Sequence, residues 1–415
     1  MNDALPPHYR SLLRVSGLPR LVVAALLGRI GGQMWTVALV LFALARFHSA
    51  AIAGATVFAS ALPGILVSPL AGALLDRSGR AKLIMLDYSV AAAATTLIVL
   101  LAATGTLSVG LLIGIAAVGS LTNPLSSAGA RTLFPMLVPR HLWDRANAID
   151  SAGYVVAAVV GAPLAGVIAG LVSRPAALVA TAAVFAAAAL SLIGMGPLPL
   201  TRRSSSRSVV REAWAGLSYV ARNPSLRGLA VSLSVANIAN GVLIVGLPVL
   251  VLDHLHQNAA VVGALWALSA LSGGVVAVVL GHRGSQGREL RLIVSGMLAT
   301  VVALLVLAVA PDVLVVALGM LLYGASGGPI DIGMFSMRQR RTDPAWYGRA
   351  FAVSMSLNYV GSPLGSAAAG PLLAAGLPIC LGAAAGVSLV AAILGLVMIP
   401  GSSRDPRRHG VPRPA

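Results

Sequence analysis

The stretch GALLDRSGRAKLI (Gly72–Ile84) is a short charged segment between two long apolar ones. The apolar residues before it, about 51–75, and after it, about 82–104, are each long enough to cross a bilayer core of roughly 30 Å as a helix. Gly72 lets two helices approach closely, and Gly79 permits a tight turn. The stretch therefore predicts two membrane-spanning helices joined by a charged turn.

The rest of the chain continues this pattern. Of its 415 residues, 58% are hydrophobic and only 10% are charged, whereas soluble domains carry about 25% charged residues. This composition excludes a soluble enzyme and a disordered chain, and a single cysteine, Cys380, excludes a disulfide scaffold. We predict an all-α integral membrane protein with twelve spans, at about residues 20–45, 51–75, 82–104, 106–130, 146–171, 175–196, 227–252, 258–281, 290–310, 312–337, 349–375 and 377–400.

The basic residues are distributed unevenly along these spans. If both termini are cytoplasmic, all of the 29 Lys and Arg residues lie on the cytoplasmic side except Arg29, within the first span, and Arg46 and Arg174, outside. Such a bias is what the positive-inside rule requires, so we predict cytoplasmic N- and C-termini. Topology and contact with anionic membrane lipids then account for the net charge of +17, and no nucleic-acid partner is expected.

Landmarks recur in the two halves of the chain. Pro124 and Pro329 each follow a glycine by five residues, and RANA at Arg145 corresponds to RAFA at Arg349. The distance along the sequence between the two members of each pair is nearly constant. This is typical of transporters built from two repeats, so we expect two pseudo-symmetric six-helix bundles. The expected domains are a first bundle at 1–196, a cytoplasmic linker at 197–226, a second bundle at 227–400 and a basic cytoplasmic tail at 401–415. The linker pattern indicates a basic amphipathic helix, with a plain charged linker as the alternative.

Six positions of the opening stretch match the loop signature G-x-L-a-D-r-x-G-r-k of the major facilitator superfamily: Gly72, Leu74, Asp76, Arg77, Gly79 and Arg80. The sequence therefore resembles that superfamily. The resemblance implies the major facilitator fold of two six-helix bundles, which works by alternating access. It also implies that the loop is an inner gate that locks one state of the transporter.

A narrower resemblance covers most of the chain. The stretches Ala130–Asp150, Ala215–Gly228 and Gln339–Val353 are similar to stretches of the drug:proton antiporter-3 group, which includes macrolide and enterobactin exporters. This resemblance implies proton-coupled export of an amphiphilic small molecule (a drug, an antibiotic or a siderophore-like metabolite) by a monomer in the inner (plasma) membrane. The alternative is an uptake permease or facilitator for a small nutrient on the same fold.

The fifth span carries a motif of its own. GAPLAG, with Gly161, Pro163 and Gly166, is similar to the antiporter motif G-P-x-x-G-G, with the proline one place later. Gly and Pro inside a span ease close packing and bending of the helix. The motif has two open interpretations, a packing role and a role specific to export.

Arg29 is the clearest ionisable residue inside a span, and such residues are functional candidates by default. Gln33 lies one turn later on the same helical face. We place both on a central cavity, where Arg29 would contact an anionic or acceptor-rich substrate. The alternative is a structural arginine that pairs with an acid or with carbonyl groups of a neighbouring helix.

Three aspartates are candidates for proton coupling, which needs a carboxylate held in the membrane. Asp331 is preferred, because it lies in the inner third of the tenth span beside Gly328 and Pro329. Asp87 and Asp150 are the other two, although we expect them to be local partners of basic residues, either Arg131 and Arg145 or those of the loop signature.

Neutral polar and aromatic residues complete the predicted substrate cavity: Trp35, Asn123, Asn237, Asn240, Trp266 and Asn358. Taken singly, each is more often a packing residue than a ligand contact. No nucleotide-binding loop, zinc-protease motif or nucleophile elbow is present in the sequence, so we predict no enzyme activity and no cofactor. No metal site is expected either, because the Asp253-His254-Leu255-His256 turn is typical of a solvated loop.

Overall fold

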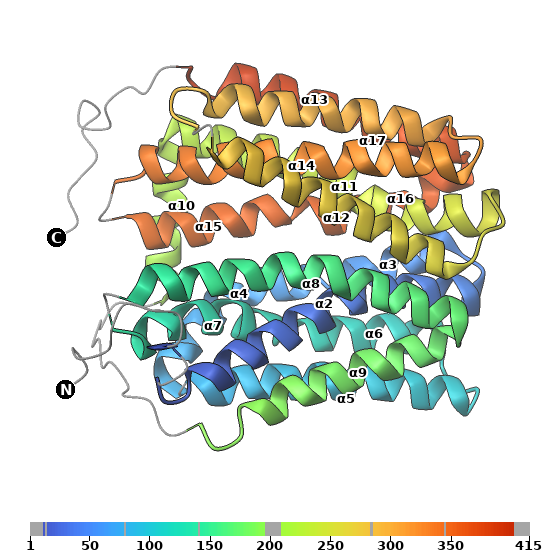
Figure 1. Ribbon diagram of the computed structural model, residues 1–415, viewed down its shortest axis with the longest axis horizontal. Coiled ribbons are helices and arrows are strands. Elements are labelled where there is room, and N and C mark those ends of the chain that lie inside the picture. The colour runs from blue at the N-terminus through green and yellow to red at the C-terminus, as the bar shows by residue number, and fades with distance from the viewer. Residues whose placement is uncertain are drawn as a thin grey trace. The chain divides into compact units, whose positions relative to one another are not determined.

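The computed structural model describes residues 11–12, 15–78, 80–139, 142–195, 209–282, 285–343 and 346–401. The regular elements in these ranges are helices, and these ranges contain no strand. In chain order (Figure 1) they are α2 (Leu18–Phe47), α3 (Ala50–Ala59), α4 (Leu62–Ser78), α5 (Arg80–Ala103), α6 (Val109–Ser120), α7 (Asn123–Leu137), α8 (Trp143–Leu171), α9 (Arg174–Ser191), α10 (Val209–Arg222), α11 (Pro224–Val249), the π-helical turn η2 (Leu250–His254), α12 (Ala259–His282), α13 (Glu289–Ala308), α14 (Val313–Arg341), α15 (Tyr347–Tyr359), α16 (Gly361–Ala374) and α17 (Leu377–Met398).

Eleven helical segments among the described residues are long and apolar enough to cross a membrane. The segment expected at 349–375, which forms α15 and α16 of 13 and 14 residues, is not one of them. Large apolar side chains also lie exposed on the helix surfaces, for example Val309 at 76%, Leu314 at 80% and Val397 at 78%. Exposure on this scale suits contact with lipid rather than with water.

Prolines explain where the expected second, fourth and eleventh spans are interrupted. Each first half ends four residues before a proline: α3 at Ala59 before Pro63, α6 at Ser120 before Pro124, and α15 at Tyr359 before Pro363. A proline lacks the N–H that would bond to the carbonyl four residues earlier, and its ring clashes with that carbonyl. The helix therefore ends where that hydrogen bond would have formed.

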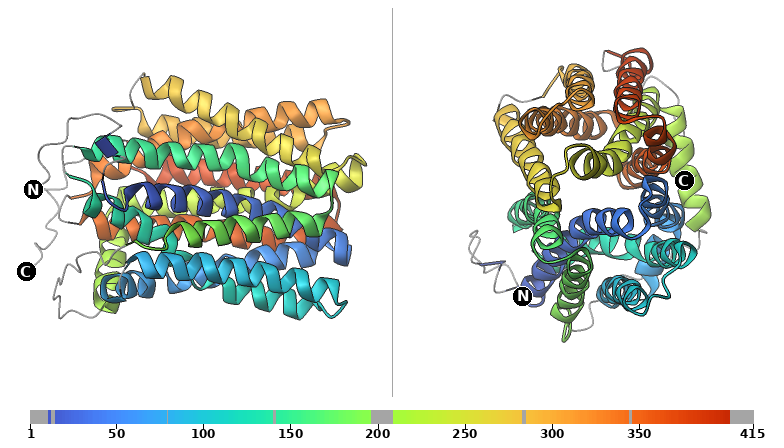
Figure 2. Two further views of the ribbon diagram at one scale, coloured as in Figure 1. Left: turned by 60° about the horizontal axis from the view of Figure 1, so that its bottom comes forward. Right: turned by 90° about the vertical axis from the view of Figure 1, so that its right-hand side faces the viewer.

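The packing of the chain forms two compact units, each of which takes a segment from the opposite half of the sequence. Unit 1 comprises Met1–His48, Ala59–Ser205 and Asn258–Ala267. Unit 2 comprises Ser49–Phe58, Ser206–Gln257 and Leu268–Ala415. In both units the helices run side by side, as the end-on view in Figure 2 shows.

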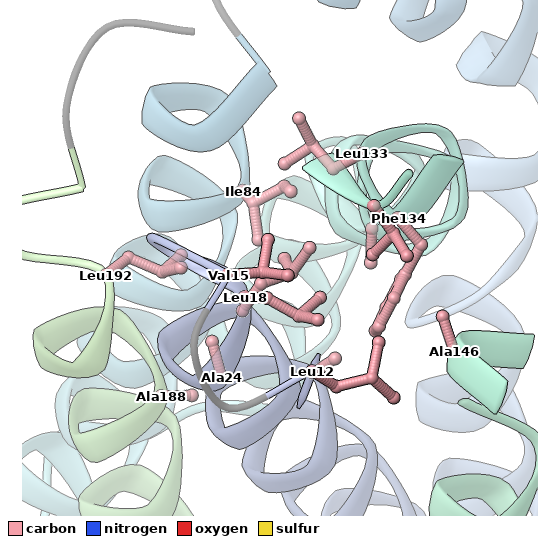
Figure 3. Packing of buried hydrophobic residues seen from close by; sticks show 14 of the residues in the cluster. Leu12, Val15, Leu18, Ala24, Ile84, Leu133, Phe134, Ala146, Ala188 and Leu192 are labelled. Carbon is pink, nitrogen blue, oxygen red and sulfur yellow. The ribbon is translucent and has the colours of Figure 1, made fainter. Parts of the chain in front are cut away.

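Each unit has its own apolar core. In unit 1, side chains from α2, α5, α7 and α9 meet, and Figure 3 shows Leu18, Ile84, Phe134 and Leu192 pointing toward one another. In unit 2, the corresponding cluster joins α10, α11, α13, α14 and α17 and includes fully buried Leu229, Ile293 and Met337. These clusters hold the helices that carry the polar residues described next.

Candidate functional site

Arg29 lies inside α2, eleven residues after the helix begins at Leu18, or about 16 Å along its axis. Its Nη1 donates to the main-chain oxygen of Asp150 at 3.0 Å, and its Nη2 forms an ion pair with the Asp150 carboxylate. The two side chains are only 13% and 16% exposed. The structure thus joins α2 and α8 through a largely buried ion pair between residues 121 positions apart.

This pairing differs from the partners expected for Asp150. The sequence suggested Arg131, Arg145 or the basic residues of the loop signature, which lie near it on the predicted cytoplasmic side. In the structure Arg29 takes that place, because α2 packs along α8 and brings the guanidinium next to the carboxylate. Arg29 thus pairs with an acid of a neighbouring helix, as its alternative interpretation has it. A contact between Arg29 and the substrate stays a prediction.

Two tyrosines that the sequence analysis did not single out belong to the same cluster. The Arg29 guanidinium carbon lies 3.8 Å from the centre of the Tyr154 ring, a cation–π contact. Tyr88 is buried, and its hydroxyl interacts electrostatically with Arg29 and Tyr154. Tyr154 follows Asp150 by four residues on α8, so helical spacing places both on one face.

Asp87 lies next to Tyr88 on α5 and is buried, with only 4% of its surface exposed. Its carboxyl group interacts with the hydroxyls of Thr122 and Ser126. These hydroxyls come from the residue before α7 and from its first turn. Asp87 and Asp150 therefore both lie in unit 1, with different partners.

The two glycines of the GAPLAG motif lie at close contacts of α8, and the contact at Gly161 is with α2, the helix that carries Arg29. A Cβ atom on Gly161 would lie 2.6 Å from the Cβ of Gln33 and 2.8 Å from the main-chain oxygen of Ile30. A Cβ atom on Gly166 would lie 2.6 Å from the Cα of Gly263, in the α12 segment of unit 1. Pro163 is partly exposed and lies between these two contacts inside α8, which continues through it. Both glycines thus sit where a neighbouring backbone leaves no room for a side chain.

The other residues of unit 1 that were predicted to line the substrate cavity differ in how far they are exposed. Gln33 and Asn123 are exposed, and Asn123 is the first residue of α7. Trp35 packs against the hydrophobic cluster of unit 1. Trp266, in the segment Asn258–Ala267, is partly buried.

The asparagines of unit 2 form two hydrogen-bonded groups along α11. Asn237 donates to the Asn358 side-chain oxygen at 3.2 Å, and Asn358 is itself buried. Asn240 donates to the Tyr323 hydroxyl at 2.6 Å and accepts from Ser362 at 3.3 Å. The structure thus pairs two of the expected amides, Asn237 and Asn358, and gives the third, Asn240, a partner in Tyr323, which the sequence analysis missed.

Asp331 is exposed on α14. Seven residues later, on nearly the same helical face, Arg338 is buried and donates to Ser354 at 3.0 Å. The two side chains interact electrostatically. Asp331 belongs to unit 2, and the Arg29 cluster belongs to unit 1.

Part of the loop signature lies outside the described residues. This applies to Gly79, to the contacts of Gly72 and to the side chains of Asp76 and Arg77. Leu74 is exposed at 42%, and Arg80 contacts the sulfur of Met136. Residues 197–208 of the predicted linker and the tail from 402 onward are likewise outside the described ranges.

Proteins of similar sequence are named as membrane transporters. A protein of Sinorhizobium fredii named as an uncharacterized MFS-type transporter, y4rN, is 41% identical over 394 residues, which cover 94% of this chain and 97% of that protein. The multidrug efflux pump Tap of Mycolicibacterium fortuitum is 27% identical over 372 residues, 86% of this chain and 89% of the pump.

Among solved structures, a variant of the nucleoside transporter NupG superposes with a TM-score of 0.76 at 12% identity, over 92% of this chain and 99% of that one. This likeness shows the fold. The family model described as Major Facilitator Superfamily matches residues 21–366 and 229–414, which together span nearly the whole sequence. The chain therefore belongs to the Major Facilitator Superfamily and is a multi-pass membrane transporter of small molecules.

Proposed function

We propose that this transporter exports an amphiphilic small molecule of neutral or positive charge from the cell in exchange for protons. It would lie in the plasma membrane with both termini in the cytoplasm. In this proposal α15 and α16 together cross the membrane as a twelfth span, so that residues 1–196 and 227–400 each supply six. The similarity to the efflux pump Tap supports the direction of transport.

The Arg29–Asp150 pair carries the proposal for coupling. When Asp150 is ionised, its negative charge offsets that of Arg29, and the surroundings of the pair tolerate a neutral or cationic ligand. When Asp150 takes up a proton, Arg29 keeps its charge and no longer has a counter-ion. In a medium of low dielectric constant, this uncovered positive charge repels a cationic ligand strongly. Proton binding would therefore expel the substrate, as antiport requires.

The same pair defines the second candidate, proton-coupled uptake of an anionic nutrient. A protonated Asp150 leaves the guanidinium free to bind a carboxylate or phosphate group. Proton and anion would then bind together and move in the same direction. The charge of the transported molecule therefore predicts the direction of its coupling to protons. Export is preferred, because the relative with a stated transport activity is an efflux pump.

The test uses the purified protein in liposomes with an imposed proton gradient and a panel of cationic, neutral and anionic amphiphilic dyes. We expect movement of a cationic or neutral dye against the proton flow. Asp150→Asn should abolish gradient-driven accumulation but leave downhill exchange of dye. Asp253→Asn, the same change at an exposed position in η2, is the matched control.

Two results would contradict the proposal. Cotransport of an anion with protons would favour the uptake candidate instead. Unchanged gradient-driven transport in Asp150→Asn would exclude this carboxylate as the proton carrier, and Asp331→Asn and Asp87→Asn would then be tested in the same liposomes.

A further inference from the structure

Arg46 and Arg174 lie far apart in the sequence but line the same cleft in unit 1. The cleft holds about 500 Å³ and is formed by the end of α2, the end of α8, the start of α9 and the start of α12. Arg46 is in the last turn of α2, and Arg174 is the first residue of α9. In the predicted topology these are the two basic residues on the external side, and the fold gathers both at one place.

The cleft carries positive charge that nothing in its lining offsets. Both arginines are exposed, and within the described ranges neither guanidinium makes an ion pair or a hydrogen bond. None of the described residues that line the cleft is Asp or Glu. The amide oxygen of Asn258 caps the start of α12 by accepting from the Val261 amide at 3.2 Å, which leaves its NH₂ group as a donor.

The remaining lining is largely apolar and includes Phe42, Val172 and Pro175. A volume of this size falls within the range of small-molecule sites, which combine apolar walls with a few placed polar groups. Two guanidinium groups suit a ligand with a phosphate or carboxylate group, because their planar forks match these oxygens. The apolar wall suits a hydrocarbon chain attached to that group.

We propose that this cleft is a binding site for an amphiphilic anion, in which Arg46 and Arg174 hold a phosphate or carboxylate group and the wall around Phe42 and Val172 covers the adjoining hydrocarbon. Both a phospholipid headgroup and a free amphiphilic anion have this chemistry. The site does not depend on the direction of transport or on the Arg29–Asp150 pair, so its test is independent of the proposed function.

Binding is measured by calorimetry on the purified full-length protein in a non-ionic detergent. The probes are hexyl phosphate and dihexanoyl-phosphatidylglycerol, with hexyl glucoside and dihexanoyl-phosphatidylcholine as partners without net negative charge. We expect binding of the anionic probes alone, weakened by raising the salt from 0.01 M to 0.15 M as charge screening increases. The double variant Arg46→Gln/Arg174→Gln should lose affinity by roughly three- to thirtyfold, as two exposed ion pairs would.

The matched control is Arg222→Gln/Arg227→Gln, which removes two exposed arginines from unit 2 and leaves the net charge equal to that of the first double variant. It should bind both anionic probes as the native protein does. Arg46→Lys/Arg174→Lys should bind with intermediate affinity. Because all four arginines are exposed, unfolding temperatures should stay near the native value, and this is checked for each variant.

The two probes distinguish the sources of the anion. Binding of dihexanoyl-phosphatidylglycerol alone assigns the cleft to lipid, and binding of hexyl phosphate alone assigns it to free anions; either supports the anion site. Equal affinities in the native protein and Arg46→Gln/Arg174→Gln, or no binding of either probe to the native protein, would overturn the proposal.

Discussion

Replacing Gly161 with alanine tests the close contact of α2 with α8. The new Cβ would lie 2.6 Å from the Cβ of Gln33 and 2.8 Å from the Ile30 oxygen. An ordinary contact of this kind needs about 3.4 Å. The two helices would have to separate by several tenths of an ångström, because the atoms involved belong to or adjoin the backbone. The change would also move Asp150 relative to Arg29, since these two residues are carried by the same helices.

The expected free energy is the sum of two opposing terms. Alanine is favoured over glycine inside a helix by roughly 0.5–1 kcal/mol. Overpacking a tight contact costs roughly 1–3 kcal/mol. We therefore expect Gly161→Ala to be destabilised by up to about 2.5 kcal/mol.

Gly114 provides the matched control, because a Cβ atom there would meet nothing within 4 Å. Gly114→Ala in α6 has the same gain in helix propensity without the steric cost, so it should be slightly stabilised. The difference between the two variants then isolates the packing term of roughly 1–3 kcal/mol. The assay is thermal unfolding in detergent, followed by circular dichroism, with the native protein alongside.

The two variants should shift the unfolding midpoint in opposite directions. Hydrogen exchange should also become faster in the amides of α2 and α8 in Gly161→Ala alone. If Gly161→Ala proved as stable as Gly114→Ala, with unchanged exchange, the inferred contact between α2 and α8 would be refuted.

Two further predictions follow from side-chain contacts. In a double-mutant cycle of Arg29→Gln and Asp150→Asn, the stability losses should not add, with a coupling of roughly 1–3 kcal/mol from thermal unfolding; additive losses would show that the pair contributes nothing. Trp346→Ala removes the ring that stacks on Tyr219 at 5.0 Å, so trypsin should cleave the α10 region faster than in the native protein. Trp214→Ala, at a side chain 68% exposed, is the control, and equal cleavage rates in both variants would contradict the stacking role.

The sequence allowed the helices to be located because their signal is local. Long apolar runs indicate spans, and the prolines mark where three of them are interrupted. The missing hydrogen bond of Pro363 explains the division into α15 and α16 but could not have predicted it, because α8 continues through Pro163 and α14 continues through Pro329. The span predicted at 349–375 is formed by α15 and α16, and its crossing of the membrane stays a prediction.

The candidate site was less accessible to sequence reasoning. Arg29 could be singled out by its position in a span, and Asp150 by its charge, yet their pairing was not foreseen. The asparagines of α11 were identified as polar residues in a span, but the Tyr323 hydroxyl that Asn240 contacts lies on another helix. The positions of Arg46 and Arg174 in the sequence likewise did not indicate that both would line one cleft.

The sequence by itself determined that this protein is a helical membrane transporter of its superfamily, because apolar length, charge bias and the loop signature are all properties of short stretches. Only the tertiary structure decided that Asp150 is the partner of Arg29 and that Arg46 and Arg174 share a cleft. Helical periodicity defines which residues share a face, but it does not say which helix packs against that face. That choice depends on close contacts such as the one at Gly161, where the absence of a side chain lets two backbones meet.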